Sequence, residues 1–240
     1  LFRTDEEAAE YAQKVDCSYF TKRIDATATR KGLHAGDPKF LDLNGDNKIS
    51  IGKNTVEDPG DRVVIGNSLP RYSYTFGGDF SWNGIDFSIL FQGVGKRNWY
   101  PSSGQANLFW GPYCRQLVDQ VWSEDNTDAY FPFPRGYEAY SDNTNSHYTL
   151  TSPNDRYIQN VAYLRLKNLT VGYTLPVLKK YLQQVRIYFT GENLAYWSPM
   201  KKYCKYIDPE AAVSSSSYVE NSGEVYNFSK VFSFGIDITF

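Results

Sequence analysis

The sequence has no run of apolar residues that approaches the length of a transmembrane helix, which needs about 18 or more. This absence does not exclude a membrane β-barrel, because barrel strands are only about half apolar. The sequence also has no block of basic residues, and its formal net charge of -2 gives no reason to expect nucleic acid as a partner. It begins without a methionine or a signal peptide, so for an exported protein we expect a mature chain or a fragment.

Motifs for catalysis and redox chemistry are scarce. The two histidines, His34 and His147, have no nucleophile motif nearby, and no glycine-rich segment matches a phosphate-binding fingerprint. The three cysteines (Cys17, Cys114 and Cys204) are far apart and show no CxxC spacing, which argues against zinc and against a redox motif. We expect unpaired thiols, with one disulfide still open in an oxidising compartment. The sequence therefore predicts no enzyme.

Aromatic residues are abundant instead: they make up 17% of the chain, with 20 Tyr, 15 Phe and 5 Trp. Tyrosine and tryptophan gather where an apolar body meets a wet rim, as in the interface belts of membrane proteins. Carbohydrate-binding surfaces are also rich in aromatic side chains. Composition alone therefore does not choose between a membrane protein and a sugar-binding protein.

The segment 230–240 alternates between two kinds of side chain up to the last residue. Successive side chains of a strand point to opposite faces, so one face is wholly apolar and the other is mostly small or polar. The apolar face consists of Phe232, Phe234, Ile236, Ile238 and Phe240. A strand of a soluble β-sandwich can alternate too, but lipid-sized side chains and a terminal aromatic favour the closing strand of an outer-membrane β-barrel.

Similar alternation predicts an all-β chain with five strands. Their expected ranges are 71–82, 85–94, 161–175, 185–197 and 230–240. Asn83-Gly84 between the first two is the strongest short hairpin signal, because both residues tolerate positive φ. Within the third range the apolar phase changes, which predicts a β-bulge near Lys167.

The connections between these strands alternate in length. The tight turn at 83–84 is followed by a very long connection at 95–160, a short one at 176–184 and a long one at 198–229. This alternation fits an outer-membrane barrel, which has short periplasmic turns and long extracellular loops. Five strands cannot close a barrel, since about eight is the smallest number in bacterial outer membranes, and an open edge would leave backbone groups unsatisfied in lipid. We therefore expect the C-terminal portion of a larger antiparallel transmembrane barrel.

The region 1–70 is expected to be an extracellular loop region ahead of barrel strands within 71–240. Residues 4–7 have capping-box spacing and predict a short helix at 6–15. A second helix is expected at 116–122. Both helices would lie in extracellular loops.

The segment 42–50 has the D-x-N-x-D spacing that opens an EF-hand-type calcium loop. The expected Ca²⁺ ligands are the side chains of Asp42, Asn44 and Asp46 and the backbone carbonyl of Lys48. The position that normally supplies a bidentate carboxylate is Lys53, so Asp58 or Asp61 would have to fold back. The alternative is an Asx-rich turn held by local hydrogen bonds.

Aromatic side chains dominate the connection at 95–160, where they would stack on sugar rings or bury against a partner protein. The alternative is internal packing that stiffens the loop. The candidate ligand- or partner-contacting residues are Trp99, Tyr100, Trp110, Tyr113, Trp122, Tyr130 and Phe131. Charged residues on the polar phase of the strands, such as Asp86, Arg186 and Asp237, would be costly in a soluble core unless paired, but they are ordinary in a hydrated barrel.

Seven stretches, in order along nearly the whole chain, carry a family resemblance. They are DLNGDNKIS (42–50), DRVVIGNSLPRYSYTFG (61–77), FQGVGKRNWYP (91–101), NTDAYFPFPR (126–135), RYIQNVAYLRLKNLTVGYTLP (156–176), RIYFTGENLAYWSP (186–199) and SFGIDITF (233–240). Through them the chain resembles the C-terminal quarter or so of the SusC/RagA-like TonB-dependent transporters of the Bacteroidota outer membrane.

The resemblance implies a barrel of about 22 strands with an N-terminal plug and a TonB-contacting segment, both of which this chain would lack. It also implies a SusD-like surface lipoprotein that caps the barrel, a glycan or peptide captured between the two proteins, and TonB-driven displacement of the plug. The implied function is nutrient import across the outer membrane of a Gram-negative bacterium. The rival function, from another class, is a secreted β-sandwich that binds carbohydrate.

Overall fold

The computed structural model describes residues 1–19, 33–100, 120–133, 153–176, 182–205, 207–212 and 228–240. The chain divides into two compact units, each made of two segments. The first unit comprises Leu1–Ile65 and Pro101–Tyr157, and the second comprises Gly66–Tyr100 and Ile158–Phe240. The regular elements in the described residues are mostly strands, with one α-helix, which agrees with the all-β class expected from the sequence.

The first unit holds helix α1 (Asp5–Lys14), which begins one residue before the expected range. Thr4 caps the helix, because its Oγ1 accepts a hydrogen bond from the backbone N–H of Glu7 at 3.2 Å, as the capping-box spacing predicts. The Glu7 carboxylate accepts from the backbone N–H of Arg3 at 2.8 Å, one residue before the partner that a full capping box would use. Within the part of the chain that the structure describes, no helix is long and apolar enough to cross a membrane.

A small apolar core packs beside α1. Its buried members are Phe2, Ala8, Val15, Cys17, Leu33 and Ile49. The backbone of Asp16, just after the helix, donates to the carbonyl of Asn47 and accepts from the N–H of Ile49, so the 42–50 segment is tied to the end of α1. The second expected helix, at 116–122, lies mostly outside the described residues, and its last three residues form no α-helix.

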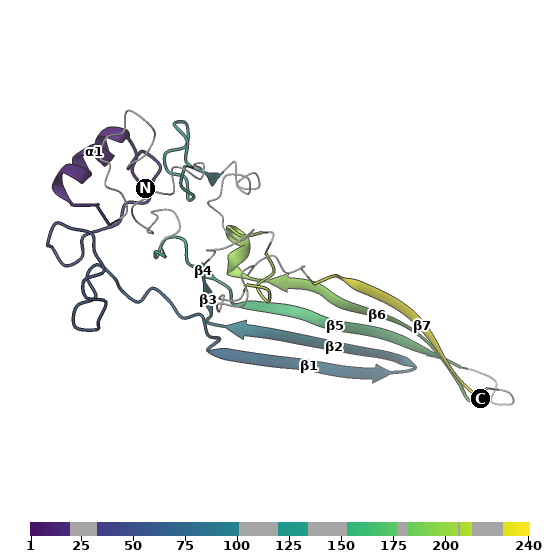
Figure 1. Ribbon diagram of the computed structural model, residues 1–240. Coiled ribbons are helices and arrows are strands. Elements are labelled where there is room, and N and C mark those ends of the chain that lie inside the picture. Colours follow the sequence, from purple (N-terminus) through teal and green to yellow (C-terminus); the bar gives the residue numbers. More distant parts are fainter. Residues whose placement is uncertain (20–32, 101–119, 134–152, 177–181, 206, 213–227) are drawn as a thin grey trace. The chain divides into compact units, whose positions relative to one another are not determined.

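The second unit is built on a five-stranded antiparallel sheet in the order β1-β2-β5-β6-β7, with the strands side by side (Figure 1). The strands are β1 (Tyr72–Trp82), β2 (Ile85–Gly95), β5 (Tyr163–Leu175), β6 (Gln184–Trp197) and β7 (Val231–Thr239). These bounds differ from the ranges expected from the sequence by about two residues or fewer, which is the usual uncertainty of a strand end.

A short ladder, which the sequence did not predict, pairs β3 (Asn98–Trp99) with β4 (Gln159–Asn160). It joins the beginning and the end of the long connection that follows β2. The expectation of a connection without strands over 95–160 is therefore corrected: both of its ends are held by antiparallel pairing, which buries Trp99 and Gln159.

The sheet has its short connections at one end and its long connections at the other, as the loop lengths predict. Asn83 and Gly84 have φ of 48° and 84°, so the tight hairpin after β1 uses the left-handed region expected for this dipeptide. The end of β7 lies at the same end of the sheet, where Thr239 pairs with Gln184. The connections after β2 and β6 leave from the opposite end.

One face of the sheet is apolar across all five strands, and we call it the apolar face. A single row across it reads Phe80, Phe87, Val171, Phe189 and Phe234, as the pairing register shows. The opposite face, which we call the polar face, carries mostly Ser, Thr, Asp, Arg and Gly on the same strands. The side chains of the apolar face are largely exposed in the described residues, with 82% of Phe234 accessible.

A β-bulge in β5 keeps the apolar face continuous. Leu90 pairs with Asn168 and the next residue, Phe91, pairs with Leu166, so Lys167 is the extra residue. The bulge moves the even-numbered leucines of β5 onto the same face as the odd-numbered apolar residues that follow. The bulge predicted near Lys167 is thus confirmed.

The two cysteines within the described residues, Cys17 and Cys204, are unpaired and buried, whereas Cys114 lies outside them. Burial raises the pKa of the Cys17 thiol to about 11 and that of Cys204 to about 12.

At pH 8 only about one Cys204 thiol in 10⁴ is then the reactive thiolate, so we expect slow alkylation of both thiols in the folded protein and fast alkylation after denaturation. Maleimide labelling, resolved peptide by peptide with mass spectrometry, measures both rates; equal rates in the two states would contradict the prediction.

Candidate functional site

The polar face carries an ion-pair network that reaches across four strands. The Arg186 guanidinium, on β6, donates from Nε and Nη2 to the two carboxylate oxygens of Asp86, on β2, at 2.9 and 2.6 Å. Its Nη1 also donates to Asp237, on β7, at 3.1 Å. The contact to Asp86 passes over β5, and a bidentate arginine–carboxylate pair fixes geometry better than a single contact does. The sequence placed these three residues on one face, and the structure brings them together.

Gly172, on β5, provides the room that this network needs. A Cβ at this position would lie 2.4 Å from Oδ1 of Asp86 and 2.7 Å from Nε of Arg186. We therefore expect Gly172→Ala to displace the guanidinium and to destabilise the full-length protein by about 1–3 kcal/mol, the usual cost of overpacking. Thermal unfolding in detergent measures the loss. Gly78→Ala is the matched control, because a Cβ on Gly78 meets nothing within 4 Å, and an equal loss in both variants would contradict the prediction.

A second ionic cluster lies at the end of the polar face where the long connections leave. Nη2 of Arg165, on β5, lies 2.5 and 2.6 Å from the two carboxylate oxygens of Asp208, and only 1% and 2% of these side chains are exposed. The Glu210 carboxylate lies 3.5 Å from Nε of Arg165 and 3.1 Å from Nζ of Lys167. Tyr163 donates its hydroxyl to the same carboxylate at 2.8 Å. The cluster thus pairs two cations with two carboxylates, and the side chains of Arg165 and Asp208 are buried.

This cluster, which we call the Arg165 cluster (Arg165, Lys167, Asp208 and Glu210), anchors the segment after β6 to the sheet. The segment begins with the short 3₁₀-helix η3 (Pro199–Lys202) and ends in a turn where the backbone N–H groups of Ala211 and Ala212 donate to the Asp208 carbonyl. The guanidinium of Arg97 donates to the carbonyl of Ala212 at 2.6 Å. The described part of the connection after β6 is therefore fixed at the rim of the polar face.

The aromatic residues predicted to contact a ligand or a partner are mostly packed inside their own unit. Trp122 and Phe131, in the first unit, and Trp99, in the second, are buried. Tyr130 is half-buried, stacks edge-on against Phe131 at 4.8 Å between ring centroids, and donates its hydroxyl to the Arg156 carbonyl. Tyr100 is half-buried, and Trp110 and Tyr113 lie outside the described residues. This packing matches the alternative of a stiffened loop, and contact with a ligand or partner stays a prediction.

The D-x-N-x-D segment is folded by hydrogen bonds of its own. Asp42 accepts from the backbone N–H groups of Gly45 and Asn47, at 2.7 and 2.8 Å. Asn44 and Asp46 each accept from the N–H two residues further on. These are the contacts of the Asx-rich turn.

Asp61 does fold back onto this segment, but as a hydrogen-bond acceptor. Its carboxylate accepts from the N–H groups of Leu43 and Ser50, both at 2.7 Å. The described residues contain no group of three or more His, Cys, Asp or Glu side chains that could hold a metal ion. Calcium at 42–50, with the carbonyl of Lys48 as a ligand, stays a prediction.

The Arg165 cluster was not found from the sequence. Its cations lie in a strand whose pattern was clear, but Asp208 lies 43 residues further along in a connection without periodicity. The sequence held one signal of this cluster: Arg165 and Lys167 flank Leu166 on the polar phase of β5. An arginine that becomes buried requires a partner for its charge. The partner's position could not be read from local patterns.

Comparison with known proteins finds two curated relatives of this chain. No family model matches it. It is 28% identical over 235 residues to TonB-dependent receptor P26 of Formosa agariphila, a match that covers 91% of this chain and 21% of that protein. It is 32% identical over 182 residues to TonB-dependent receptor P3 of the same organism, covering 71% of this chain and 15% of that protein.

Solved structures of a peptide importer are also similar to this chain. The structure of the RagAB peptide importer in the "open-open" state matches with a TM-score of 0.47 and 22% identity, over 74% of this chain and 18% of that one. The "closed-closed" state matches with a TM-score of 0.49 and 20% identity, over 88% and 21%.

The chain is thus related to TonB-dependent receptors, and the resemblance inferred from its sequence is confirmed. The two curated relatives are receptors and not enzymes, in line with the absence of catalytic motifs from the sequence. The chain spans about a fifth of the length of the first of these relatives and less of the second.

Proposed function

We propose that the five-stranded sheet is part of the wall of an outer-membrane β-barrel, with the apolar face toward lipid and the polar face toward a hydrated lumen. The strands have 9 to 14 residues, against the roughly 9–11 that a tilted strand needs to cross the bilayer. The apolar side chains are exposed, and the ion-paired residues lie on the other face. Beyond β1 and β7 the sheet has no further strand in the described residues, so more strands must follow on both edges if it lies in lipid.

The function follows from this placement and from the curated relatives. The whole protein acts as a TonB-dependent importer of nutrients across the outer membrane of a Gram-negative bacterium. Its full barrel has about 22 strands, as in the large plugged transporters. Glycans or peptides are captured between the extracellular loops and a SusD-like surface lipoprotein, and TonB opens the lumen through the plug. The observation that carries the proposal is the continuous, exposed apolar face opposite an ion-paired polar face.

The rival function, a secreted β-sandwich that binds carbohydrate, requires a second sheet over the apolar face. Among the described residues the other sheet is the two-stranded β3–β4 ladder, which is far too small to cover five strands. Phe80, Trp82 and Phe234 remain exposed as a result. An uncovered apolar surface of this extent marks contact with a membrane or a partner.

A deletion of the whole gene in its native bacterium tests the proposed function. We expect loss of growth on one nutrient class, either oligosaccharides or oligopeptides, and recovery when the full-length gene is restored. A protonophore should abolish uptake of the labelled nutrient, because TonB draws on the proton gradient. The receptor should also leave the membrane fraction only with detergent and bring a lipoprotein with it. Unchanged uptake of both classes, together with a detergent-independent protein, would overturn the proposal.

A further inference from the structure

A cavity of about 370 Å³, which we call the Arg97 cavity, lies at the start of β1 and the end of β2, where the long connections leave. Three cationic residues and three asparagines line it: Asn67, Arg71, Lys96, Arg97, Asn98 and Asn160. Among the described residues no acidic residue lines it. The cavity therefore combines positive charge with hydrogen-bond donors.

Two of the cations, Arg71 and Lys96, are neighbours across the open end of the β1–β2 hairpin. The register ends at Tyr72 and Gly95, and the backbone N–H of Arg71 donates to the Lys96 carbonyl at 3.4 Å. Like charges that face each other across antiparallel strands are destabilising. Both side chains are exposed, and neither forms an ion pair within the described residues. The pair therefore costs the free protein stability, and a bound anion would remove that cost.

The third cation, Arg97, is held by carbonyl groups and not by a carboxylate. Its Nε donates to the Ser68 carbonyl at 3.3 Å, and its Nη2 donates to the Ala212 carbonyl at 2.6 Å. These bonds orient the half-buried guanidinium but do not neutralise its charge. Ala212 belongs to the turn that Asp208 ties to the polar face, and Arg71 continues the polar phase of β1. The Arg97 cavity thus lies at the rim of the polar face.

The three asparagines turn their amide oxygens toward backbone donors. Oδ1 of Asn67 accepts from the N–H of Leu69 at 2.9 Å, and Oδ1 of Asn98 accepts from the N–H of Asn67 at 3.3 Å. Oδ1 of Asn160 accepts from the N–H of Ala162 at 3.1 Å. None of the three Nδ2 groups donates to an acceptor within the described part of the chain. Each asparagine therefore keeps its NH₂ group for a ligand.

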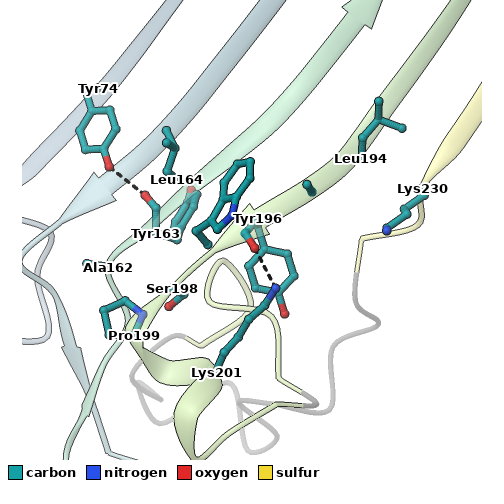
Figure 2. Close-up of a pocket in the computed structure, with 12 residues that line it drawn as sticks. Tyr74, Ala162, Tyr163, Leu164, Leu194, Tyr196, Ser198, Pro199, Lys201 and Lys230 are labelled. Atoms are coloured by element: carbon teal, nitrogen blue, oxygen red, sulfur yellow. Dashed lines mark hydrogen bonds between the residues drawn. The ribbon is translucent and has the colours of Figure 1, made fainter.

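A larger cavity of the second unit, of about 770 Å³, does not bring its cations together (Figure 2). Nζ of Lys201 donates to the carbonyl of Tyr196 at 2.7 Å, and Tyr196 pairs with Arg165, whose side chain lies on the polar face. Lys230 instead continues the phase of Phe232 on the apolar face. Its two lysines belong to opposite faces, so the Arg97 cavity is the better anion site.

We propose that the Arg97 cavity binds the carboxylate or sulfate group of an acidic oligosaccharide during import. The inference rests on the proposed function, because it needs the polar face to line the path of a nutrient. An oxyanion brings several acceptor oxygens to a lining of cations and amide donors. The volume is at the small end of ligand cavities, which suits a single sugar unit.

The lining favours a sugar over a peptide as the carrier of the anion. The oxygens of the three asparagine side chains are already used by backbone N–H groups, so the side chains offer donors and no free acceptor. A peptide brings a backbone N–H with each carbonyl, and that N–H needs an acceptor. A uronate or a sulfated sugar has only oxygen atoms as its polar heavy atoms around the ring, and all of them accept hydrogen bonds.

The test uses the full-length receptor purified from its outer membrane in detergent, with the proteins that accompany it, and the variant R71Q/K96Q. This variant removes two exposed charges whose side chains form no hydrogen bond or ion pair with the described residues, and it keeps Arg97, which also holds the turn. Saturation-transfer NMR titrations measure the affinity for glucuronate and for galactose 6-sulfate, with the neutral methyl ester of glucuronate as the reference.

We expect the receptor to bind both acidic sugars more tightly than the ester. R71Q/K96Q should bind the acidic sugars about tenfold more weakly, since each exposed cation in an ion pair contributes roughly a factor of three. Its affinity for the ester should not change. It should also unfold at no lower temperature than the receptor, because it relieves a contact between like charges.

The matched control is K202Q/K205Q, which removes two charges from the same unit at residues that do not line the Arg97 cavity. It should bind both acidic sugars as the unaltered receptor does. No preference of the receptor for either acidic sugar over the ester overturns the inference, and so does an equal loss of affinity in the control. A lower unfolding temperature of R71Q/K96Q, or loss of an accompanying lipoprotein from it, also overturns the inference, because the cations would then hold protein.

Two further probes test the sugar assignment. Binding of inorganic sulfate, or of the dipeptide-like N-acetylglutamate amide, as tight as that of the acidic sugars overturns it. A receptor that is soluble without detergent overturns the proposed function itself, whereas a detergent-dependent importer without a preference for acidic sugars overturns only the inference about this cavity.

Discussion

Replacing Arg165 with methionine is expected to destabilise the full-length receptor by about 3–5 kcal/mol, the range for removing one partner of a buried ion pair. Methionine fills much of the volume of the arginine stem but leaves the Asp208 carboxylate without the guanidinium that contacts both of its oxygens. Since only 1% and 2% of these side chains are exposed, the carboxylate that remains is a buried charge without its arginine partner. We expect the turn at 208–212 to leave the sheet and to become accessible to protease. Thermal unfolding and limited proteolysis in detergent measure these two effects.

A double-mutant cycle separates the ion pair from general packing. Asp208→Leu alone should be as damaging as Arg165→Met, whereas the combined variant should lose much less than the sum, because both charges leave the interior together. Arg3→Met is the control: its pair with Asp128 spans 3.4 Å between side chains that are 72% and 85% exposed, and such pairs contribute about 1 kcal/mol or less. Additive losses at Arg165 and Asp208, or a loss at Arg3 of the same size, would contradict a buried, coupled pair.

The sheet was predictable because its signals are local. The dipeptide Asn83-Gly84 is typical of a two-residue hairpin, and both residues adopt positive φ. The change of apolar phase around Lys167 indicates one extra residue in β5, and the register shows it. Strand alternation has a period of two, so a few residues suffice to assign each side chain to the apolar or the polar face.

The contacts made by the connections were not predictable, because they join residues far apart in the chain. The β3–β4 ladder pairs Asn98 with Asn160, and nothing in either dipeptide marks a strand. Asp208 reaches Arg165 from an aperiodic segment. Aromatic composition suggested exposed contact residues, but Trp122 and Phe131 are buried, because a long loop can bury its own rings to compensate for the entropy of ordering it. Local patterns therefore predict the strands of the sheet, whereas the contacts of the long connections depend on long-range packing.

Replacing Phe234 with arginine is expected to remove most of the folded receptor from the outer membrane. Phe234 lies near the middle of β7 on the apolar face, and 82% of it is exposed in the described residues. In a barrel wall this side chain faces lipid, where an arginine near the bilayer midplane costs about 2–4 kcal/mol. The quantity to measure is the amount of folded receptor in purified outer membranes, compared with the total amount made by the cell.

Ser233→Arg is the matched control, since it adds the same charge at the neighbouring residue of the same strand. Ser233 pairs with Thr190 on the polar face, where a hydrated lumen accepts an arginine. We expect this variant to assemble as the unaltered receptor does. Equal assembly of both variants would mean that neither face lies in lipid. Failure of Ser233→Arg alone would mean that the polar face is the buried one. A loss confined to Phe234→Arg is the result that a barrel wall requires, because lipid rejects an arginine at position 234 and the hydrated lumen accepts one at position 233.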